Sequence, residues 1–202
     1  MHNPQNIIFD IGMVLIKWDP RNLYRKMFTD EAKMEWFLAN VCTPAWNLEQ
    51  DRGRSFGDAV KHIMPHHPEL AAEIDAFDTR WHEMIPGVIE GCVDILETLH
   101  KKGTPLYAIT NWNQHKFKET KLSYPFLGLF RDIVVSGDEK LIKPDPAIFE
   151  LCLKRNKLKA ADCLFIDDSE KNVKGAEAVG MHAHHFTSPE KLRADLKTRG
   201  LL

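Results

Sequence analysis

Short apolar runs alternate with longer amphipathic stretches along most of the chain. The short runs predict five β-strands, within Asn6–Ile16, Pro105–Ile109, Asp132–Ser136, Asp162–Ile166 and Met181–Phe186. Helical periodicity between and after them predicts helices over Val88–Lys102, Gln114–Thr120, Pro146–Lys154 and from Ser188 to about Thr198. Strands that alternate with helices are typical of a parallel sheet covered by helices, so the pattern predicts an α/β fold with an open sheet.

One long stretch departs from this alternation. Helical periodicity recurs from Leu23 to about Ile85 without a strand-like segment, after a turn in which Asp19 and Pro20 start the first helix. Breaks at 42–44, at 53 and at 62–68 divide it into about four short helices, enough for a small bundle. We therefore expect a core domain of residues 1–17 and 86–202, interrupted by a helical cap of residues 18–85.

The cap carries four tryptophans and one polar loop. The tryptophans are interpreted mostly as bundle core; they are Trp18, Trp36, Trp46 and Trp81. The loop Glu49–Arg54 reads as a solvated surface, but an insertion next to the first strand is also well placed to contact a substrate.

Composition narrows the classes of function. The 202 residues carry a net charge of −2, without the basic excess typical of proteins that bind nucleic acid or a membrane surface. No apolar run approaches the ~20 residues of a membrane span, and the first strand begins too early for a signal peptide. The four cysteines have no C-x-x-C spacing, which favours reduced thiols. We expect a cytoplasmic protein with no nucleic-acid and no membrane partner.

Polar side chains follow three of the predicted strands. Asp10 comes after the first, Thr110 and Asn111 after the second, and Asp167 and Asp168 after the fourth. The carboxyl ends of parallel strands line the ligand crevice of an open α/β sheet, so these groups are expected to converge there. Each also has a structural interpretation, because an Asp, Thr or Asn at such a position often caps the next helix or turns the chain.

The adjacent Asp167 and Asp168 are the most specific feature. Two neighbouring carboxylates repel each other unless a cation lies between or near them, and hard oxygen ligands of this kind suit Mg²⁺. Lys143 precedes a helix that starts at Asp145-Pro146, and its setting in a Pro-x-Pro turn favours a positioned cation over a solvated arm. His182, His184 and His185 are interpreted as an exposed edge strand and not as a metal site.

The motifs FDIGMVL, ITN, IKPDPAIF and FIDDSEKNVKGAEAVG, in this order, resemble the four motifs of the haloacid dehalogenase-like (HAD) hydrolase superfamily. The insertion after the first strand is similar to its C1 cap. Within the superfamily the chain resembles the small sugar-phosphate phosphatases of bacteria, such as those acting on glucose 1-phosphate. The resemblance implies a doubly wound parallel sheet, with the motif strands side by side.

The resemblance also assigns roles. It implies Asp10 as nucleophile, Thr110 and Asn111 on the phosphate, Lys143 as the group that neutralises charge, and Asp167 with Asp168 at Mg²⁺. Asp10 and the backbone carbonyl of Gly12 would complete the metal site.

One position departs from the phosphatase pattern. Phosphatases of this superfamily carry a second Asp two residues after the nucleophile, as an acid and base, and this chain has Gly12 there. Acid–base catalysis of this kind contributes typically 10²–10⁴-fold. Another group, from the cap or a bound water, replaces it, or the substrate has a good leaving group.

The leading hypothesis is a Mg²⁺-dependent phosphatase that hydrolyses a small phosphate monoester through an aspartyl-phosphate on Asp10, acting as a monomer or homodimer. The alternative is a metal-independent 2-haloacid dehalogenase in which Asp10 attacks carbon. That branch also lacks the second Asp, but its fourth motif generally carries Ser or Asn. The pair Asp167-Asp168 therefore favours the phosphatase.

Overall fold

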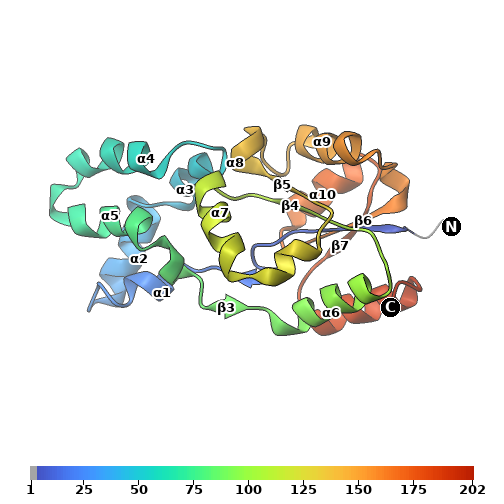
Figure 1. Cartoon of the computed structure of the whole chain (residues 1–202). Coiled ribbons are helices and arrows are strands. Elements are labelled where there is room, and N and C mark those ends of the chain that lie inside the picture. Colours follow the sequence, from blue (N-terminus) through green and yellow to red (C-terminus); the bar gives the residue numbers. More distant parts are fainter. Residues whose placement is uncertain (1–3) are drawn as a thin grey trace.

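The fold is built on a five-stranded sheet in which every neighbouring pair of strands is parallel. The computed structural model describes residues 4–202. The strands lie in the order β5-β4-β1-β6-β7, with β1 in the centre (Figure 1). Their bounds are β1 Asn6–Phe9, β4 Leu106–Thr110, β5 Asp132–Val135, β6 Cys163–Asp167 and β7 His182–His185. The chain leaves β1 on one side for β4 and β5 and returns on the other for β6 and β7, which is the doubly wound arrangement expected from the sequence.

Helices cover both faces of this sheet. Successive residues of a strand point to opposite faces, and in β1 the side chains of Ile7 and Phe9 join one hydrophobic cluster while Ile8 joins a second. The first cluster includes apolar residues of α6 (Glu90–Lys101), α7 (Gln114–Ser123) and α11 (Pro189–Thr198). The second includes those of α9 (Pro146–Asn156) and α10 (Glu170–Ala178). Burial on both faces explains why the strands read as continuous apolar runs.

A separate group of helices lies between β1 and α6 in the sequence and forms a lobe of its own (Figure 1). We call residues 18–85 the helical lobe. Its helices are α1 Arg21–Tyr24, α2 Glu31–Asn40, α3 Pro44–Asp51, α4 Phe56–Ile63 and α5 Ala71–Thr79, with 3₁₀ turns η1 Met64–His66, η2 Pro68–Leu70 and η3 Trp81–Met84. Side chains of Asp30, Thr43 and Ser55 accept hydrogen bonds from the first turns of α2, α3 and α4. Such caps satisfy backbone donors that a helix start leaves unpaired.

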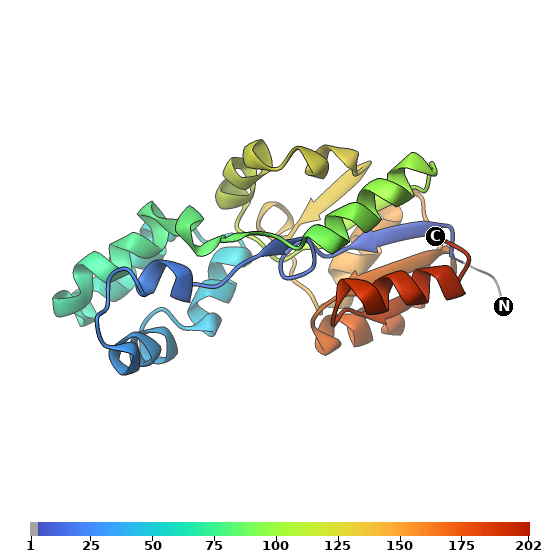
Figure 2. The same cartoon turned by 90° about the horizontal axis from the view of Figure 1, so that it is seen from below.

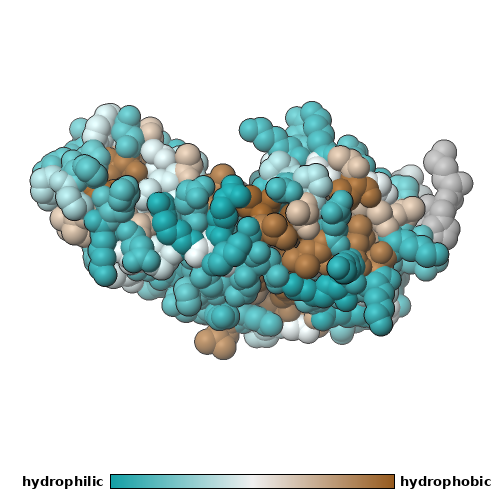
Figure 3. Space-filling model, turned by 90° about the horizontal axis from the view of Figure 1, so that it is seen from above, coloured by the Kyte–Doolittle hydropathy of each residue, from teal (hydrophilic) through white to brown (hydrophobic). Residues whose placement is uncertain are grey.

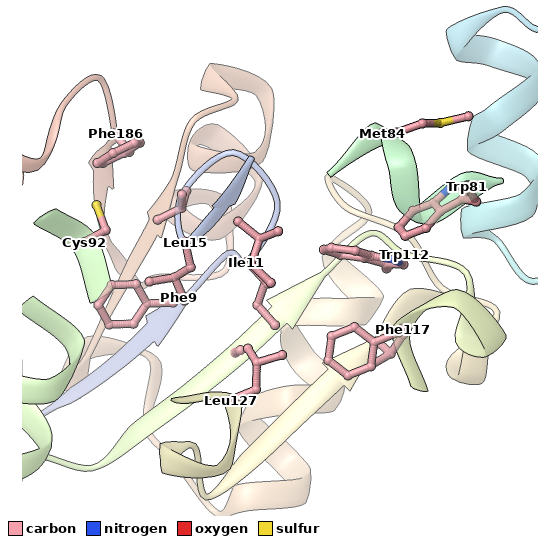
Figure 4. Packing of buried hydrophobic residues seen from close by; sticks show 14 of the residues in the cluster. Phe9, Ile11, Leu15, Trp81, Met84, Cys92, Trp112, Phe117, Leu127 and Phe186 are labelled. Atoms are coloured by element: carbon pink, nitrogen blue, oxygen red, sulfur yellow. The ribbon is translucent and has the colours of Figure 1, made fainter. Parts of the chain in front are cut away.

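Aromatic side chains fill the interior of the helical lobe. Tyr24 packs against Phe37 with ring centroids 4.9 Å apart, and Phe77 packs edge-on against Trp46 at 5.0 Å. These rings belong to the same hydrophobic cluster as Phe9 of the central strand, so one continuous core joins the lobe to the sheet. Figure 4 shows Trp81 next to Trp112 where the lobe meets the strand ends, with ring centroids 5.5 Å apart. One expectation is wrong: the side chain of Trp36 is 49% exposed and is not bundle core.

The two passages of the chain between the lobe and the sheet lie side by side. Ile16–Lys17 (β2) pairs in antiparallel register with Gly87–Val88 (β3), a ribbon that the sequence did not predict (Figure 2). Because Val88 is held in this ribbon, helix α6 begins at Glu90 and not at Val88. The division into a core of residues 1–17 and 86–202 and a cap of 18–85 stays a prediction.

The remaining short elements are α8 Ser136–Glu139, η4 Pro125–Leu129 and η5 Ala160–Asp162. The face of the molecule seen in Figure 3 is largely hydrophilic, with hydrophobic patches toward its middle. Among residues 4–202, no helix combines the length and the apolar character needed to cross a bilayer.

Candidate active site

The register of the sheet brings the polar strand ends together. Phe9 is the partner of Ile166 in β6, and the backbone N–H of Asp10 donates to the Ile166 carbonyl at 2.8 Å. The next residues, Asp10 and Asp167, therefore lie at the same level of neighbouring strands. Thr110 ends β4 on the other side of β1. The convergence expected from the sequence is present.

Three carboxylates and one ammonium group occupy this edge. Asp10, Asp167 and Asp168 each offer one oxygen, and these oxygens all lie within 4.8 Å of one another. The Lys143 Nζ lies 2.9 Å from Asp10 Oδ2 and 2.6 Å from Asp167 Oδ2. Asp10, Lys143 and Asp167 are buried, and Asp168 is exposed. The four groups carry more negative than positive charge, as a cation site requires.

Hydrogen bonds fix both buried carboxylates. Asp167 accepts from the Ser169 backbone N–H at 2.8 Å, and the Asn172 amide donates to both of its oxygens at 3.0 and 3.1 Å. Asp10 accepts from the Ile11 N–H at 2.6 Å. Asn172, in the first turn of α10, thus positions Asp167, a contact for which the sequence analysis gave no residue.

Asn111 holds the Lys143 segment in place. Its amide donates to the Lys143 carbonyl at 3.0 Å and its Oδ1 accepts from the Lys143 N–H at 2.9 Å. The Thr110 hydroxyl is fully buried, and within the described part of the chain it has no hydrogen-bond partner. The Asn111 side chain thus binds the segment around Lys143, whereas the Thr110 hydroxyl, at the end of β4, makes no hydrogen bond within the described residues. Whether either contacts phosphate stays a prediction.

Burial dominates the electrostatics of the site. It raises the pKa of Asp10 to about 8, although Lys143 pulls that pKa back down; Asp167 adds to the rise. Burial and Asp167 together raise the pKa of Asp168. The pKa of Lys143 is raised because Asp10 and Asp167 outweigh the desolvation of its ammonium group. Carboxylates so crowded are unfavourable in the charged form without a further cation.

The turn after Asp10 differs from expectation in one detail. A glycine in such a turn favours a left-handed backbone at Gly12, but the left-handed residue is Met13, with φ of 57°, whose N–H donates to the Ile16 carbonyl at 2.8 Å. A Cβ built on Gly12 meets no atom within 4 Å. The position would therefore accept a side chain without a steric clash.

A pocket of about 170 Å³ opens next to Asp10 and Gly12. The helical lobe supplies Asn47 and Asp51 from one face of α3, together with two of its tryptophans. The full lining is Asp10, Gly12, Met13, Trp18, Asn47, Asp51, Trp81, Asn111 and Trp112. Trp18 and Trp81, interpreted as bundle core, thus line the pocket.

The loop 49–54 is docked on the strand ends through its own backbone. Asn113 Nδ2 donates to the carbonyls of Gln50 and Arg54 at 3.1 and 3.2 Å, and Ser136 Oγ donates to the Asp51 carbonyl at 2.5 Å. Lys140 Nζ donates to the Gly53 carbonyl at 3.1 Å. Of this loop, Asp51 is the residue whose side chain reaches the pocket.

Two other members of the loop point elsewhere. Arg54 Nε donates to Gln50 Oε1 at 2.6 Å, and Arg52 is exposed, 3.6 Å from Glu49. The loop expected over Glu49–Arg54 is therefore partly helical, because Glu49–Asp51 form the end of α3. The helical spacing of Asn47 and Asp51 was the signal that could have indicated which of these residues lines the pocket. Whether the segment contacts a substrate stays a prediction.

Two phosphatases are similar in sequence to most of this chain. The sesquiterpene phosphatase astK of Aspergillus oryzae is 27% identical over 180 residues, which cover 89% of this chain and 88% of that protein. Phosphoglycolate phosphatase 1 of Pseudomonas aeruginosa is 32% identical over 198 residues, covering 91% of this chain and 70% of that protein.

Solved structures share the fold. A HAD family enzyme from Bacteroides thetaiotaomicron, in complex with magnesium and inorganic phosphate, superposes with a TM-score of 0.70 at 22% identity, covering 92% of this chain and 95% of that one. A predicted HAD-like hydrolase from Porphyromonas gingivalis gives a TM-score of 0.73 at 18% identity, covering 98% of both chains.

A protein-family model described as haloacid dehalogenase-like hydrolase matches residues 7–185, from β1 to the end of β7. This span includes Asp10, Lys143 and the paired carboxylates. The protein belongs to the haloacid dehalogenase-like (HAD) hydrolases.

Proposed function

We propose that the protein is a Mg²⁺-dependent phosphatase that hydrolyses a small phosphate monoester through an aspartyl-phosphate on Asp10. The observation that carries this proposal is the cluster of Asp10, Asp167 and Asp168 around Lys143 at the carboxyl end of the sheet. Phosphoryl transfer requires a nucleophile and positive charge that stabilises the phosphoryl oxygens, and a carboxylate beside an ammonium group and a cation site supplies both.

The residues have distinct roles in this reaction. Asp10 attacks phosphorus in line with the leaving oxygen, and the P–O bond to the leaving group breaks as the Asp10–phosphorus bond forms. Lys143 neutralises charge on the phosphoryl oxygens. The Thr110 hydroxyl donates to one of them, and Asn111 keeps the Lys143 segment in register with it. Water then cleaves the aspartyl-phosphate and restores Asp10.

The donor set fits magnesium. Asp10, Asp168 and the Gly12 carbonyl supply hard oxygens, and Asp167 completes the acidic group while it also binds Lys143. Magnesium binds typically through one or two carboxylates plus substrate phosphate and water, which matches the number of groups here. When bound, it neutralises the phosphoryl group and the carboxylates around it.

The pocket favours a small substrate of the sugar-phosphate kind. Its volume of about 170 Å³ is below the range of about 300–1,000 Å³ that is usual for drug-sized ligands. Trp18, Trp81 and Trp112 offer flat apolar faces, and the indole N–H groups of Trp18 and Trp112 have no partner within residues 4–202. Such a lining suits a compact ring that carries hydroxyl groups. The four cysteines are buried free thiols, which supports a cytoplasmic location.

The test is one panel of substrates, with and without chelator. We expect phosphate release from glucose 1-phosphate, phosphoglycolate and p-nitrophenyl phosphate that requires added Mg²⁺, and no halide release from 2-chloropropionate. Asp10→Asn should abolish turnover. Asp94→Asn, which changes an exposed carboxylate on α6, is the matched control and should leave the rates unchanged.

Three results would contradict the proposal. Undiminished phosphate release after exhaustive chelation would contradict the dependence on Mg²⁺. Halide release in the presence of chelator would favour a dehalogenase. Radiolabelled phosphate trapped on a residue other than Asp10 would contradict the assignment of Asp10 as the nucleophile.

A further inference from the structure

The proposed reaction lacks a proton donor at the position where it is expected. Gly12 offers no side chain, and an alkoxide leaving oxygen must receive a proton as the P–O bond breaks. Within the described chain, the carboxyl groups at the strand ends are already occupied: Asp10 is the nucleophile, and Asp167 and Asp168 belong to the cation site. The donor must therefore reach the pocket from another element.

Asp51 reaches the same pocket from the helical lobe. It is the last residue of α3, its side chain is half-buried, and it lines the pocket together with Asp10 and Gly12. Asn47, one turn earlier on the same helix face, donates from Nδ2 to Asp51 Oδ2 at 3.2 Å. That bond holds the Asp51 carboxyl group beside Asn47, which lines the same pocket from the lobe side.

The backbone of Asp51 is anchored to the sheet. Ser136 Oγ donates to its carbonyl, and Asn113 Nδ2 holds the carbonyl of the preceding Gln50 at 3.1 Å. Both donors are buried and lie just past the carboxyl ends of β5 and β4. The carboxyl group of Asp51 therefore keeps its place relative to Asp10 without a loop having to order first, as a general acid requires.

The surroundings of Asp51 favour its protonated form. Burial raises its pKa well above the ordinary value, although the backbone N–H of Asn113 lowers it in part. Asp51 also ends α3, where the backbone carbonyls disfavour a negative charge. Two cations are near in sequence, but Arg52 is exposed and Arg54 binds Gln50.

We propose that Asp51 is the general acid and base that replaces the missing carboxyl group at Gly12; this inference rests on the proposed phosphatase activity. In the first step the Asp51 carboxyl proton passes to the leaving oxygen, while Asp10 Oδ bonds to phosphorus. In the second step the Asp51 carboxylate takes a proton from the water that attacks the aspartyl-phosphate. The products are alcohol, inorganic phosphate and a protonated Asp51, so the cycle closes.

The leaving group provides the test, because only poor leaving groups need the proton. Asp51→Asn should lower kcat for alkyl phosphates such as glycerol phosphate by about 100-fold or more. For p-nitrophenyl phosphate, whose leaving group tolerates negative charge, kcat should change less than about fivefold. Glu49→Gln, on the same helix but exposed and outside the pocket lining, is the control and should change neither rate.

A second variant returns the acid to the position where it is expected. A Cβ at residue 12 meets no atom within 4 Å, so Gly12→Asp places a carboxyl group on the opposite wall of the same pocket. In the Asp51→Asn background, Gly12→Asp should raise kcat for alkyl phosphates at least tenfold. The carboxyl ¹³C resonance of Asp51, assigned in the wild-type protein, should titrate above the ordinary Asp range, a readout that needs neither substrate nor metal.

The outcomes separate the two proposals. If the wild type releases phosphate from no ester, the proposed function and this inference both fail. If the wild type is active and Asp51→Asn lowers both classes of ester equally, or neither, the general acid is elsewhere while the phosphatase stands. Should Asp51→Asn not fold, Asp51→Ser and the ¹³C titration of the wild type decide, and an Asp51 carboxyl that titrates in the ordinary range overturns the inference.

Discussion

Replacing Asp10 with asparagine should make the metal-free protein more stable while it removes activity. Burial raises the Asp10 pKa to about 8 from an ordinary value of 3.8, so the folded state binds this proton more tightly than the unfolded chain. Stability contributed by Asp10 is therefore complete below about pH 4 and is lost as the pH rises toward 8. Asparagine carries no charge, so the Asp10→Asn variant does not lose this stability as the pH rises.

The magnitude follows from the width of that pH window. About four pH units at about 1.4 kcal/mol each give a ceiling of roughly 6 kcal/mol. The introduced amide no longer forms an ion pair with Lys143, which keeps its 2.6 Å contact with Asp167. Since that loss offsets part of the gain, we expect about 2–4 kcal/mol at pH 8 and less at pH 5. For a chain of this size about 2 kcal/mol corresponds to roughly 4–8 °C in Tm.

Urea unfolding of both proteins in chelator, at pH 5 and pH 8, measures this difference. Asp94→Asn is again the control and should change the free energy of unfolding by less than about 0.5 kcal/mol. Added Mg²⁺ should stabilise the wild type more than Asp10→Asn, because the variant has lost one ligand. An Asp10→Asn protein that is no more stable than the wild type at pH 8 would show that the carboxylate cluster is not strained, and the reasoning would fail.

Three further substitutions test individual contacts. Asn111→Ala removes both hydrogen bonds to the Lys143 segment, so we expect a loss of about 2 kcal/mol in urea unfolding and a fall in kcat. Thr110→Val removes a buried hydroxyl without a partner in residues 4–202, so stability should stay equal or rise by up to about 1 kcal/mol while the KM for the phosphate ester rises; a clear loss of stability would contradict this. Arg54→Ala should lower Tm because it removes hydrogen bonds to Gln50 and to the Trp46 carbonyl, whereas Arg52→Ala, at an exposed site, should not. Equal effects of the two substitutions on Tm would contradict a structural role of Arg54.

The sheet and the reacting groups were predictable because they depend on local pattern. The three inner strands β4, β1 and β6 are apolar runs buried on both faces, and the carboxyl ends of parallel strands meet at one edge. Asp10, Thr110 and Asp167 could therefore be placed near one another without knowledge of any long-range contact. Membership of the HAD hydrolases, recognised from four short motifs, is confirmed over residues 7–185.

What the sequence did not predict depends on packing between distant segments. The pairing of Ile16 with Val88 joins residues far apart in the chain, and neither dipeptide is long enough to read as a strand. The left-handed backbone at Met13 follows from its hydrogen bond to Ile16 and not from its residue type. Asp51 carries no motif, and its place in the pocket becomes visible only once α3 is docked.

The loop 49–54 is attached to the sheet through bonds that do not depend on its own side chains. All four anchoring bonds, from Asn113, Ser136 and Lys140, end on main-chain carbonyls, which every amino acid provides. Apart from Gly53, where a Cβ would meet the Gly137 carbonyl at 2.7 Å, the side chains of this loop can therefore be exchanged without loss of these bonds. Substitutions next to Asp51 can in this way reshape the pocket wall while the anchored backbone keeps Asp51 itself in place.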